Sequence, residues 1–299
     1  MLIDIKGITG LTNCKYLLDE PLAKYTTWKV GGKADILFLP ESTESCLKVL
    51  HALYDRGTPY FVLGNGSNIL IGDKGFRGAV VKLAGLNNMD FTENIVTVGC
   101  GAMLPVLAVE AAKRHFSGLE FIAGIPGTVG AALKINAGAD GENISDVFHS
   151  AIVWQDGLQK EVFAEDMQYS YRQSAFKNAS AVFLMAKFSL AYGEQEKIKH
   201  KMQQNISARK SKQPLEYPNA GSVFKNPVGS FAGKLIADAG LQGRSIGGAT
   251  VSLKHANFIV NTGHATAEDT KKLILLVQQE VASYSGITLE PEVEFIGEF

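Results

Sequence analysis

The stretch GLEFIAGIPGTVGAALKINAGADG, residues 118–141, decides how the rest of this 299-residue chain is interpreted. It is too apolar and too rich in glycine for an ordinary solvated loop. Within it, GIPGTVG spaces Gly124, Gly127 and Gly130 three residues apart. Because glycine lacks a Cβ, this spacing allows the chain to lie flat against a planar ring or a pyrophosphate. A glycine-rich helix contact explains the pattern equally well.

A second glycine-rich loop, LGNGSNILIGDKGFRG at 63–78, follows a short apolar strand. Gly64 and Gly66 allow successive backbone N–H groups to converge on one anion. Ser67 and Asn68 add side-chain donors without adding charge. The competing interpretation is a tight surface turn.

The common nucleotide-binding motifs do not match. Ile69 stands where GxGxxG needs its third glycine, and Leu235 follows Lys234 where a P-loop needs Ser or Thr. A standard Rossmann or Walker site is therefore not expected.

Hydrophobic periodicity predicts helices and strands in no regular βαβ order, which is typical of an α+β fold. We expect strands at 35–39, 60–63, 79–83, 94–98 and 181–191, a hairpin of 151–155 with 159–163 around Asp156–Gly157, and a last strand within 289–297. We expect helices at 43–56, 105–115, 194–210 and 231–239, and a last one from Thr266, where Thr266 and Asp269 resemble a capping box.

Composition excludes several functional classes. Hydrophobic residues make up 46% of the chain and charged residues 20%, which is typical of a globular protein. The formal net charge of −1 gives no reason to expect nucleic acid as a partner. No signal peptide and no apolar run of membrane-spanning length is found, so we expect a cytoplasmic protein with no membrane partner.

The three cysteines are Cys14, Cys46 and Cys100. Their wide spacing, their odd number and the lack of a CxxC pair argue against a disulfide framework and against a zinc site. We expect buried structural thiols and no metal.

Three segments contain polar residues that could carry chemistry. Arg172, in YSYRQSAF (169–176), could clamp a carboxylate or phosphate, or could stack on tyrosine at the surface. Ser222, in NAGSVFKNP (219–227), follows a glycine in a polar turn. Glu292 and Glu294, in PEVEF (291–295), alternate with Val293 and so point to the face of a strand opposite to Val293, and we expect only one of them to face a site.

Taken in order, six segments resemble the UDP-N-acetylenolpyruvoylglucosamine reductase family: GGKAD (31–35), GNGSN (64–68), GIPGTVG (124–130), YRQS (171–174), AGSVFKNP (220–227) and EPEV (290–293). The similarity runs from about residue 26 to 297. It implies a two-part FAD-binding region of the p-cresol methylhydroxylase and vanillyl-alcohol oxidase type, over about 28–193, and a C-terminal α+β substrate-binding domain. The implied domains are 1–85, 86–200 and 201–299.

The resemblance also implies an activity. NADPH would reduce non-covalently held FAD, which would then reduce UDP-N-acetyl-enolpyruvoylglucosamine to UDP-N-acetylmuramate for peptidoglycan synthesis. Arg172 would polarise the enolpyruvyl carboxylate, Ser222 would donate the proton, and Glu292 would be a second polarising acid with a raised pKa. Neither an obligate protein partner nor a metal is implied.

The matching segments also supply binding residues. The implied substrate contacts are Tyr171, Lys212 and Asn226. The implied cofactor contacts are Gly64, Asn65, Gly66, Ser67, Asn68, Gly124, Ile125, Pro126, Gly127, Thr128, Gly130, Ala137 and Gly138.

The chain departs from the family pattern at Ala131, where a glycine is frequent, and at Asp140, where an aromatic residue is common. The short interval between Arg172 and Ser222 resembles the shorter branch of the family, which lacks a tyrosine-bearing substrate lid. Alternatives are another oxidoreductase that holds FAD without a covalent bond, an oxidase with covalently bound flavin, and a non-catalytic flavin-binding module. GNGSN and GIPGTVG contain no histidine or cysteine to tether a flavin, which counts against the covalent oxidase.

Overall fold

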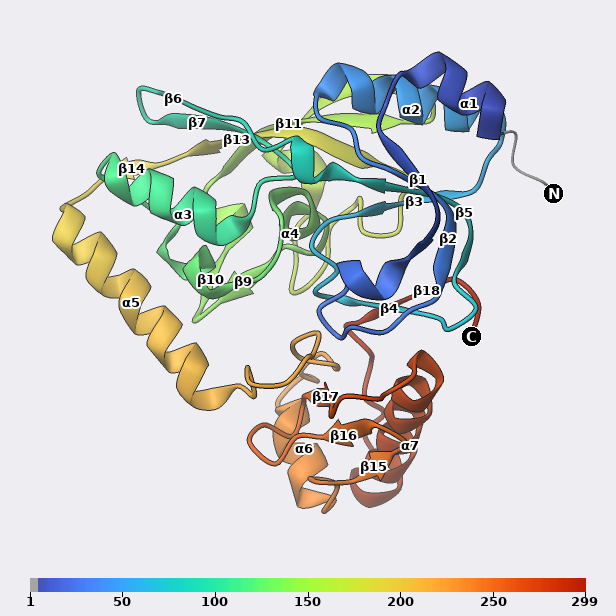
Figure 1. The fold of residues 1–299 in the computed structure, drawn as a ribbon. Coiled ribbons are helices and arrows are strands. Elements are labelled where there is room, and N and C mark those ends of the chain that lie inside the picture. The colour runs from blue at the N-terminus through green and yellow to red at the C-terminus, as the bar shows by residue number, and fades with distance from the viewer. Residues whose placement is uncertain (1–4) are drawn as a thin grey trace. The chain divides into compact units, whose positions relative to one another are not determined.

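The structure, a computed structural model, describes residues 5–299 (Figure 1). Contacts divide it into two compact units. The first unit comprises the described residues up to Leu18 together with Ile36–Asn65 and Gly78–Arg209, and the second comprises Asp19–Asp35, Gly66–Arg77 and Lys210–Phe299. The loop GNGSN therefore passes from the first unit into the second between Asn65 and Gly66.

An antiparallel five-stranded sheet is the largest element of the first unit, with the order β12-β11-β13-β7-β6. Its strands are β6 (Met89–Thr92), β7 (Ile95–Gly99), β11 (Phe148–Gln155), β12 (Leu158–Phe163) and β13 (Val182–Ser189). Two helices, α3 (Leu104–Lys113) and α4 (Val129–Ile135), share one buried apolar cluster with this sheet. The cluster includes Cys100, whose pKa is raised by burial.

The predicted hairpin is confirmed. Strands β11 and β12 pair from Ser150↔Phe163 to Gln155↔Leu158. Asp156 and Gly157 form the turn with φ of 51° and 84°, and positive φ at both central residues is typical of a two-residue hairpin turn.

A second apolar cluster of the first unit packs around helix α2 (Thr43–Asp55). The Ser42 hydroxyl accepts a hydrogen bond from the Ser45 amide and begins this helix as expected. Cys14 and Cys46 are buried free thiols in the cluster, and burial raises the pKa of Cys46 to about 12. Both are inert structural residues, as the sequence predicts.

The N-terminal third of the chain also contributes a four-stranded sheet with the order β1-β2-β5-β3. Its strands are β1 (Tyr16–Pro21), β2 (Lys33–Phe38), β3 (Tyr60–Leu63) and β5 (Phe76–Lys82), of which β3 and β5 run parallel. Helix α1 (Ile5–Thr12) precedes them and packs against α2.

The second unit has its own core. Helix α7 (Ala267–Ser285) packs against a three-stranded antiparallel sheet and contacts α6 (Ala232–Asp238) (Figure 1). The sheet consists of β15 (Ser245–Ile246), β16 (Ala249–Val251) and β17 (Ile259–Asn261). Beside them, β18 (Glu294–Ile296) pairs in parallel with β4 (Ile69–Ile71). Trp28 is fully buried in this core and donates from Nε1 to the Ile259 carbonyl at 2.7 Å.

Helix α7 begins at a doubly capped N-terminus. The predicted capping box of Thr266 and Asp269 is present. In addition, the Asp73 carboxylate accepts hydrogen bonds from the amides of Ala267, at 2.8 Å, and Glu268, at 2.9 Å. A carboxylate at this end of a helix satisfies free N–H groups and offsets the positive end of the helix dipole.

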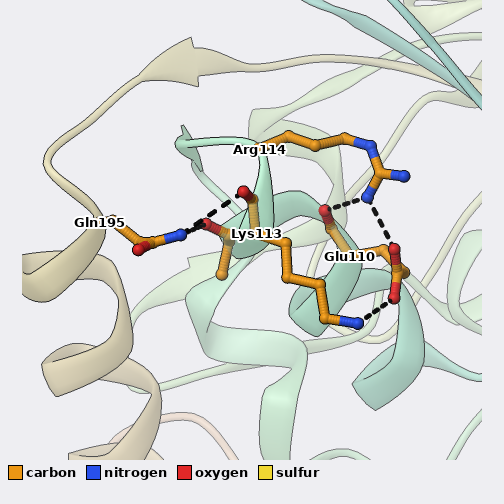
Figure 2. A network of polar contacts seen from close by, with 5 residues as sticks. Glu110, Lys113, Arg114 and Gln195 are labelled. Carbon is orange, nitrogen blue, oxygen red and sulfur yellow. Dashed lines mark hydrogen bonds and ion pairs between the residues drawn. The ribbon is translucent and has the colours of Figure 1, made fainter.

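Long helix α5 (Gln195–Lys212) is confirmed where a polar helix is expected. Gln195 Nε2 donates to the carbonyls of Ala112, at 3.3 Å, and Lys113, at 3.4 Å, at the end of α3 (Figure 2). Beside these carbonyls, Glu110 forms ion pairs with Lys113 and Arg114. The first turn of α5 is therefore anchored to the last turn of α3.

Two expectations need correction. The 181–191 strand is interrupted: β13 ends at Ser189, and Ala191–Tyr192 form the separate strand β14, paired with β8 (Phe116–Ser117). The last strand covers only Glu294–Ile296, because the preceding residues pair with a different segment. The remaining short elements are β9 (Gly138–Ala139), β10 (Glu142–Asn143) and 3₁₀ turns at Leu22–Tyr25, Leu83–Gly85, Glu120–Gly124, Ile144–Asp146 and Ala164–Met167. Within residues 5–299, no helix is both long and apolar enough to cross a membrane.

We predict that Asp73→Ala lowers the free energy of unfolding by about 1–2 kcal/mol, because two amides at the start of α7 lose their acceptor. Urea denaturation measures this difference. Asp90→Ala is the matched control, since Asp90 is exposed in β6 and accepts only from the Thr92 hydroxyl. Equal stability losses in the two variants would contradict the capping role.

Candidate active site

The two glycine-rich loops meet within the first unit. Asn65 Nδ2 donates to the Pro126 carbonyl at 2.7 Å. A Cβ placed on Gly64 would lie 2.6 Å from Thr128 Oγ1, which is closer than side chains tolerate. The loops are thus in direct contact, and glycine at position 64 is what allows that contact.

A third segment, residues 100–104, holds the GIPGTVG loop through backbone hydrogen bonds. The Leu104 amide donates to the Gly127 carbonyl, and the Val129 amide to the Ala102 carbonyl, both at 3.0 Å. The Gly130 amide donates to the Cys100 carbonyl at 2.9 Å, where α4 begins. A Cβ on Gly130 would lie 3.2 Å from the Cys100 Cβ, so this glycine serves a helix contact, the alternative that the sequence left open.

Some backbone N–H groups of the two glycine-rich loops make no hydrogen bond within the described residues. The amides of Asn65, Gly127 and Thr128 have no hydrogen-bond acceptor among residues 5–299. Gly127 and Thr128 are buried residues. Buried N–H groups without a partner are costly, so a ligand that accepts hydrogen bonds fits here. Free amides on two loops in contact suit phosphate oxygens and need no positive side chain.

Arg172 is held against the end of α4 in the same unit. Its Nη2 donates to the Gly138 carbonyl at 3.0 Å. Nearby, Asn136 Nδ2 donates to the Ser170 carbonyl at 3.2 Å, and Ser174 Oγ to the Lys134 carbonyl at 2.7 Å. The YSYRQS segment is therefore tied to the segment that follows the glycine-rich loop.

The backbone at Arg172 is strained. Its φ is 54°, in the left-handed region that residues with a side chain rarely adopt. Its guanidinium lies 5.3 Å from the ring centroid of Tyr171, which is 52% exposed. The stacking that the sequence allows is thus present, together with backbone strain of the kind that concentrates at functional sites.

Asn68 joins the first glycine-rich loop to the Glu292 segment, both in the second unit. Asn68 Nδ2 donates to the Glu292 carbonyl, and its own carbonyl accepts from the Glu294 amide, each at 3.0 Å. Gly66 has a φ of 63° and packs closely on the backbone of Tyr25. A Cβ on Gly66 would lie 2.1 Å from the Tyr25 carbonyl oxygen. Both residues therefore have a structural role, whatever their role toward the cofactor.

Ser222 and Glu292 lie on adjacent segments of the second unit. The Glu292 amide donates to the Val223 carbonyl at 2.8 Å, and the Lys225 amide to the Glu290 carbonyl at 2.9 Å. Phe224 faces Pro291 in an antiparallel bridge. Residues separated by 70 positions in sequence are thus brought within one strand spacing.

A pocket of about 400 Å³ opens beside Ser222. Its lining includes Ser222, Asn226, Phe231, Lys234, His255 and Asn257. Asn226 Oδ1 accepts from the Ala232 amide at 3.0 Å and so holds the start of α6, while Lys212 is exposed at the end of α5 and does not line the pocket.

Sequence reasoning missed three residues. His255 lines the pocket, Lys82 Nζ donates to the Gly64 carbonyl at 3.0 Å, and Arg209 donates to the Gly124 carbonyl. Burial lowers the pKa of each. No local motif marks them, because each reaches its place through tertiary packing. No group of three His, Cys, Asp or Glu side chains within 5–299 could hold a metal.

Comparisons with known proteins decide the family. A relative from Caldicellulosiruptor bescii, a UDP-N-acetylenolpyruvoylglucosamine reductase, is 46% identical over 288 residues, which cover 95% of this chain and 92% of the relative. This chain belongs to the UDP-N-acetylenolpyruvoylglucosamine reductase family. The family's C-terminal domain model matches residues 213–296, and an FAD binding domain model matches 34–157.

Other members of the reductase family agree. A UDP-N-acetylenolpyruvoylglucosamine reductase from Listeria monocytogenes is 46% identical over 282 residues, 94% of this chain and 95% of that one. The crystal structure of the reductase from Thermus caldophilus superposes with a TM-score of 0.82 at 37% identity, covering 95% of this chain and 98% of that chain. The predicted α+β fold, with an FAD-binding region and a C-terminal family domain, is confirmed, and FAD is the cofactor.

We predict that Gly64→Ala weakens FAD binding by about tenfold or more, because overpacking costs about 1–3 kcal/mol where the loops touch. Fluorescence of FAD released on dilution measures the affinity. Gly10→Ala is the matched control, since no atom lies within 4 Å of a Cβ at that helical position. Unchanged FAD affinity in Gly64→Ala would show that loop contact does not position the cofactor.

The half-buried imidazole of His255 predicts a pH effect on stability. Burial lowers its pKa, so the folded state binds this proton less readily than the unfolded state does. The neutral imidazole makes its full contribution to the free energy of unfolding above the ordinary histidine pKa of about 6.5. This contribution is lost as the pH falls below that value. The free energy of unfolding should therefore fall between pH 7 and pH 5.

His255→Gln should flatten that decline in denaturation measurements across the range. His200→Gln, at an exposed position of α5, controls for the loss of one histidine. An equally steep decline in His255→Gln and in the unchanged protein would rule out this origin.

Proposed function

We propose that the protein reduces UDP-N-acetyl-enolpyruvoylglucosamine to UDP-N-acetylmuramate, with NADPH as the electron donor and non-covalently held FAD as the carrier. The observation that carries this proposal is the pocket beside Ser222, on the segment that pairs with the Glu292 segment. A proton donor at the mouth of a pocket, next to a second acid, suits the reduction of a polarised double bond.

The first unit would supply most of the cofactor contacts, and the second unit would add Gly66, Ser67 and Asn68. Buried, unpartnered amides of Gly127 and Thr128, with that of Asn65 across the loop contact, would donate to the FAD pyrophosphate. Bound FAD supplies the hydride when it is reduced. The other proposed cofactor contacts are Gly64, Gly66, Ser67, Asn68, Gly124, Ile125, Pro126, Gly130, Ala137 and Gly138.

Arg172, Glu292 and Ser222 would carry the chemistry on the substrate. The Arg172 guanidinium would bind the enolpyruvyl carboxylate, and its hydrogen bond to the Gly138 carbonyl would orient it. Glu292, in its protonated form, would donate a hydrogen bond to that carboxylate and so stabilise the negative charge that develops when the double bond accepts a hydride. The Ser222 hydroxyl would then protonate the adjacent carbon. Serine is a weak acid, but its carbanion-like partner is a strong base, so the transfer is downhill when the atoms are aligned.

The nucleotide part of the substrate would bind in the second unit. Asn226 is fixed through its Oδ1 by the start of α6, which leaves the Nδ2 group to donate to the substrate. We assign further contacts to Tyr171 and Lys212. The remaining expectations also stand as proposals: the three domains 1–85, 86–200 and 201–299, a cytoplasmic location, and a role in the synthesis of peptidoglycan precursors.

Ser222→Ala tests the proton donor. NADPH should still reduce the bound flavin at close to the normal rate, whereas reduction of the enolpyruvyl nucleotide should fall by at least about 100-fold, the lower end for loss of a general acid. Stopped-flow absorbance of the flavin separates the two half-reactions.

Ser283→Ala is the matched control, because Ser283 is on α7 in the same unit and donates only to the Gln279 carbonyl. It should leave both half-reactions unchanged. If Ser222→Ala reduced the nucleotide at the normal rate, another group would be the donor. If the unchanged protein reduced its flavin with NADPH but never passed electrons to this nucleotide, it would be a different FAD oxidoreductase.

A further inference from the structure

We propose that Arg209, on α5, is an anion-binding residue for FAD. The proposal starts from the way α5 contacts the glycine-rich loop. Arg209 Nη1 donates to the Gly124 carbonyl, and the Arg209 Cδ atom would lie 3.4 Å from a Cβ on Gly124. The arginine side chain therefore crosses directly over the first glycine of GIPGTVG.

Helix α5 holds this arginine firmly. One turn earlier, Asn205 Nδ2 donates to the Glu120 carbonyl at 3.1 Å, so positions 205 and 209 contact the same 3₁₀ segment, Glu120–Gly124. Buried Ile198 and Met202 continue the same packed face toward the N-terminal end. Gln195 anchors that end to α3 (Figure 2).

The charge of Arg209 is not neutralised within the protein. Two other arginines do have carboxylate partners: Arg77 pairs with Asp35 at 2.8 Å, and Arg114 with Glu110 at 2.6 Å. Among residues 5–299, the only acceptor of Arg209 is a neutral carbonyl. The Glu120 carboxylate accepts instead from the Ser117 hydroxyl and the Gly118 amide.

An unpaired guanidinium in this position requires an anion. Arg209 is half-buried, and burial disfavours its charged form. A guanidinium has five N–H donors, of which the carbonyl of Gly124 uses one. The unpartnered amides of Gly127 and Thr128 lie three and four residues along the same loop. Charge and free donors thus gather on the segment proposed to hold FAD.

FAD presents two anionic groups that this arginine can bind: the pyrophosphate, in both redox states, and the flavin ring after reduction. The shared chemistry is a negatively charged oxygen or ring edge that accepts charge-assisted hydrogen bonds. The two sources differ in what they stabilise. A pyrophosphate contact strengthens binding of oxidised FAD, whereas a ring contact favours the reduced form and raises the midpoint potential.

The test compares the holoenzymes of Arg209→Gln and of the unchanged protein. We expect either an FAD dissociation constant raised at least tenfold, which indicates the pyrophosphate, or a midpoint potential lowered by at least about 30 mV, the two-electron equivalent of a tenfold change, which indicates the ring. Arg209→Lys keeps the charge and should restore part of either effect.

Asn205→Ala is the matched control, because it removes a hydrogen bond between α5 and the same segment without removing charge. If Arg209→Gln changed neither the affinity nor the potential, or only as much as Asn205→Ala does, the inference would be overturned. It rests on the FAD part of the proposed function. If the unchanged protein failed to bind FAD, the proposed function would be overturned as well. If it bound FAD and only the Arg209→Gln result was negative, this inference alone would be overturned.

Discussion

The site depends on the close approach of two glycine-rich loops, in which the backbone of each loop contacts a side chain of the other. The hydrogen bond from Asn65 to the Pro126 carbonyl holds the loops together, and glycine at position 64 leaves space for Thr128. Bonds from residues 102–104 and Cys100 fix the second loop from the other side. Two buried amides are thereby left without a partner inside the protein. Packing elsewhere in the protein offsets the free-energy cost of these unpaired donors. The donors are available to a ligand.

A nearly neutral chain can therefore bind a highly charged cofactor. In the proposed site, backbone amides would supply most of the donors, and positive charge would come from Arg209, which has no carboxylate partner among the described residues. In the second unit, Asn68 binds the backbone of Glu292, and that segment pairs with the one carrying Ser222. One short loop, GNGSN, thus contributes both to the proposed FAD seat and to the placement of a proposed catalytic acid.

Elements with strong local signals could be predicted from sequence. Ser42 and the Thr266–Asp269 box mark the starts of α2 and α7, and Asp156–Gly157 marks the hairpin. The glycine-rich stretch was harder, because spacing alone does not reveal that a helix begins at Val129. The last strand is shorter than expected because residues 290–292 pair with 223–225, a tertiary preference that alternation cannot show. Arg209 and His255 carry no local signal, since their roles depend on which distant segments reach them.

In the proposed reaction, one flavin links NADPH to the enolpyruvyl nucleotide. Under anaerobic conditions, the oxidised holoenzyme is titrated with NADPH until the flavin absorbance bleaches, and the enolpyruvyl nucleotide is then added. We expect the absorbance to return fully, with one UDP-N-acetylmuramate formed per flavin. A flavin that stays reduced after the nucleotide is added would contradict it.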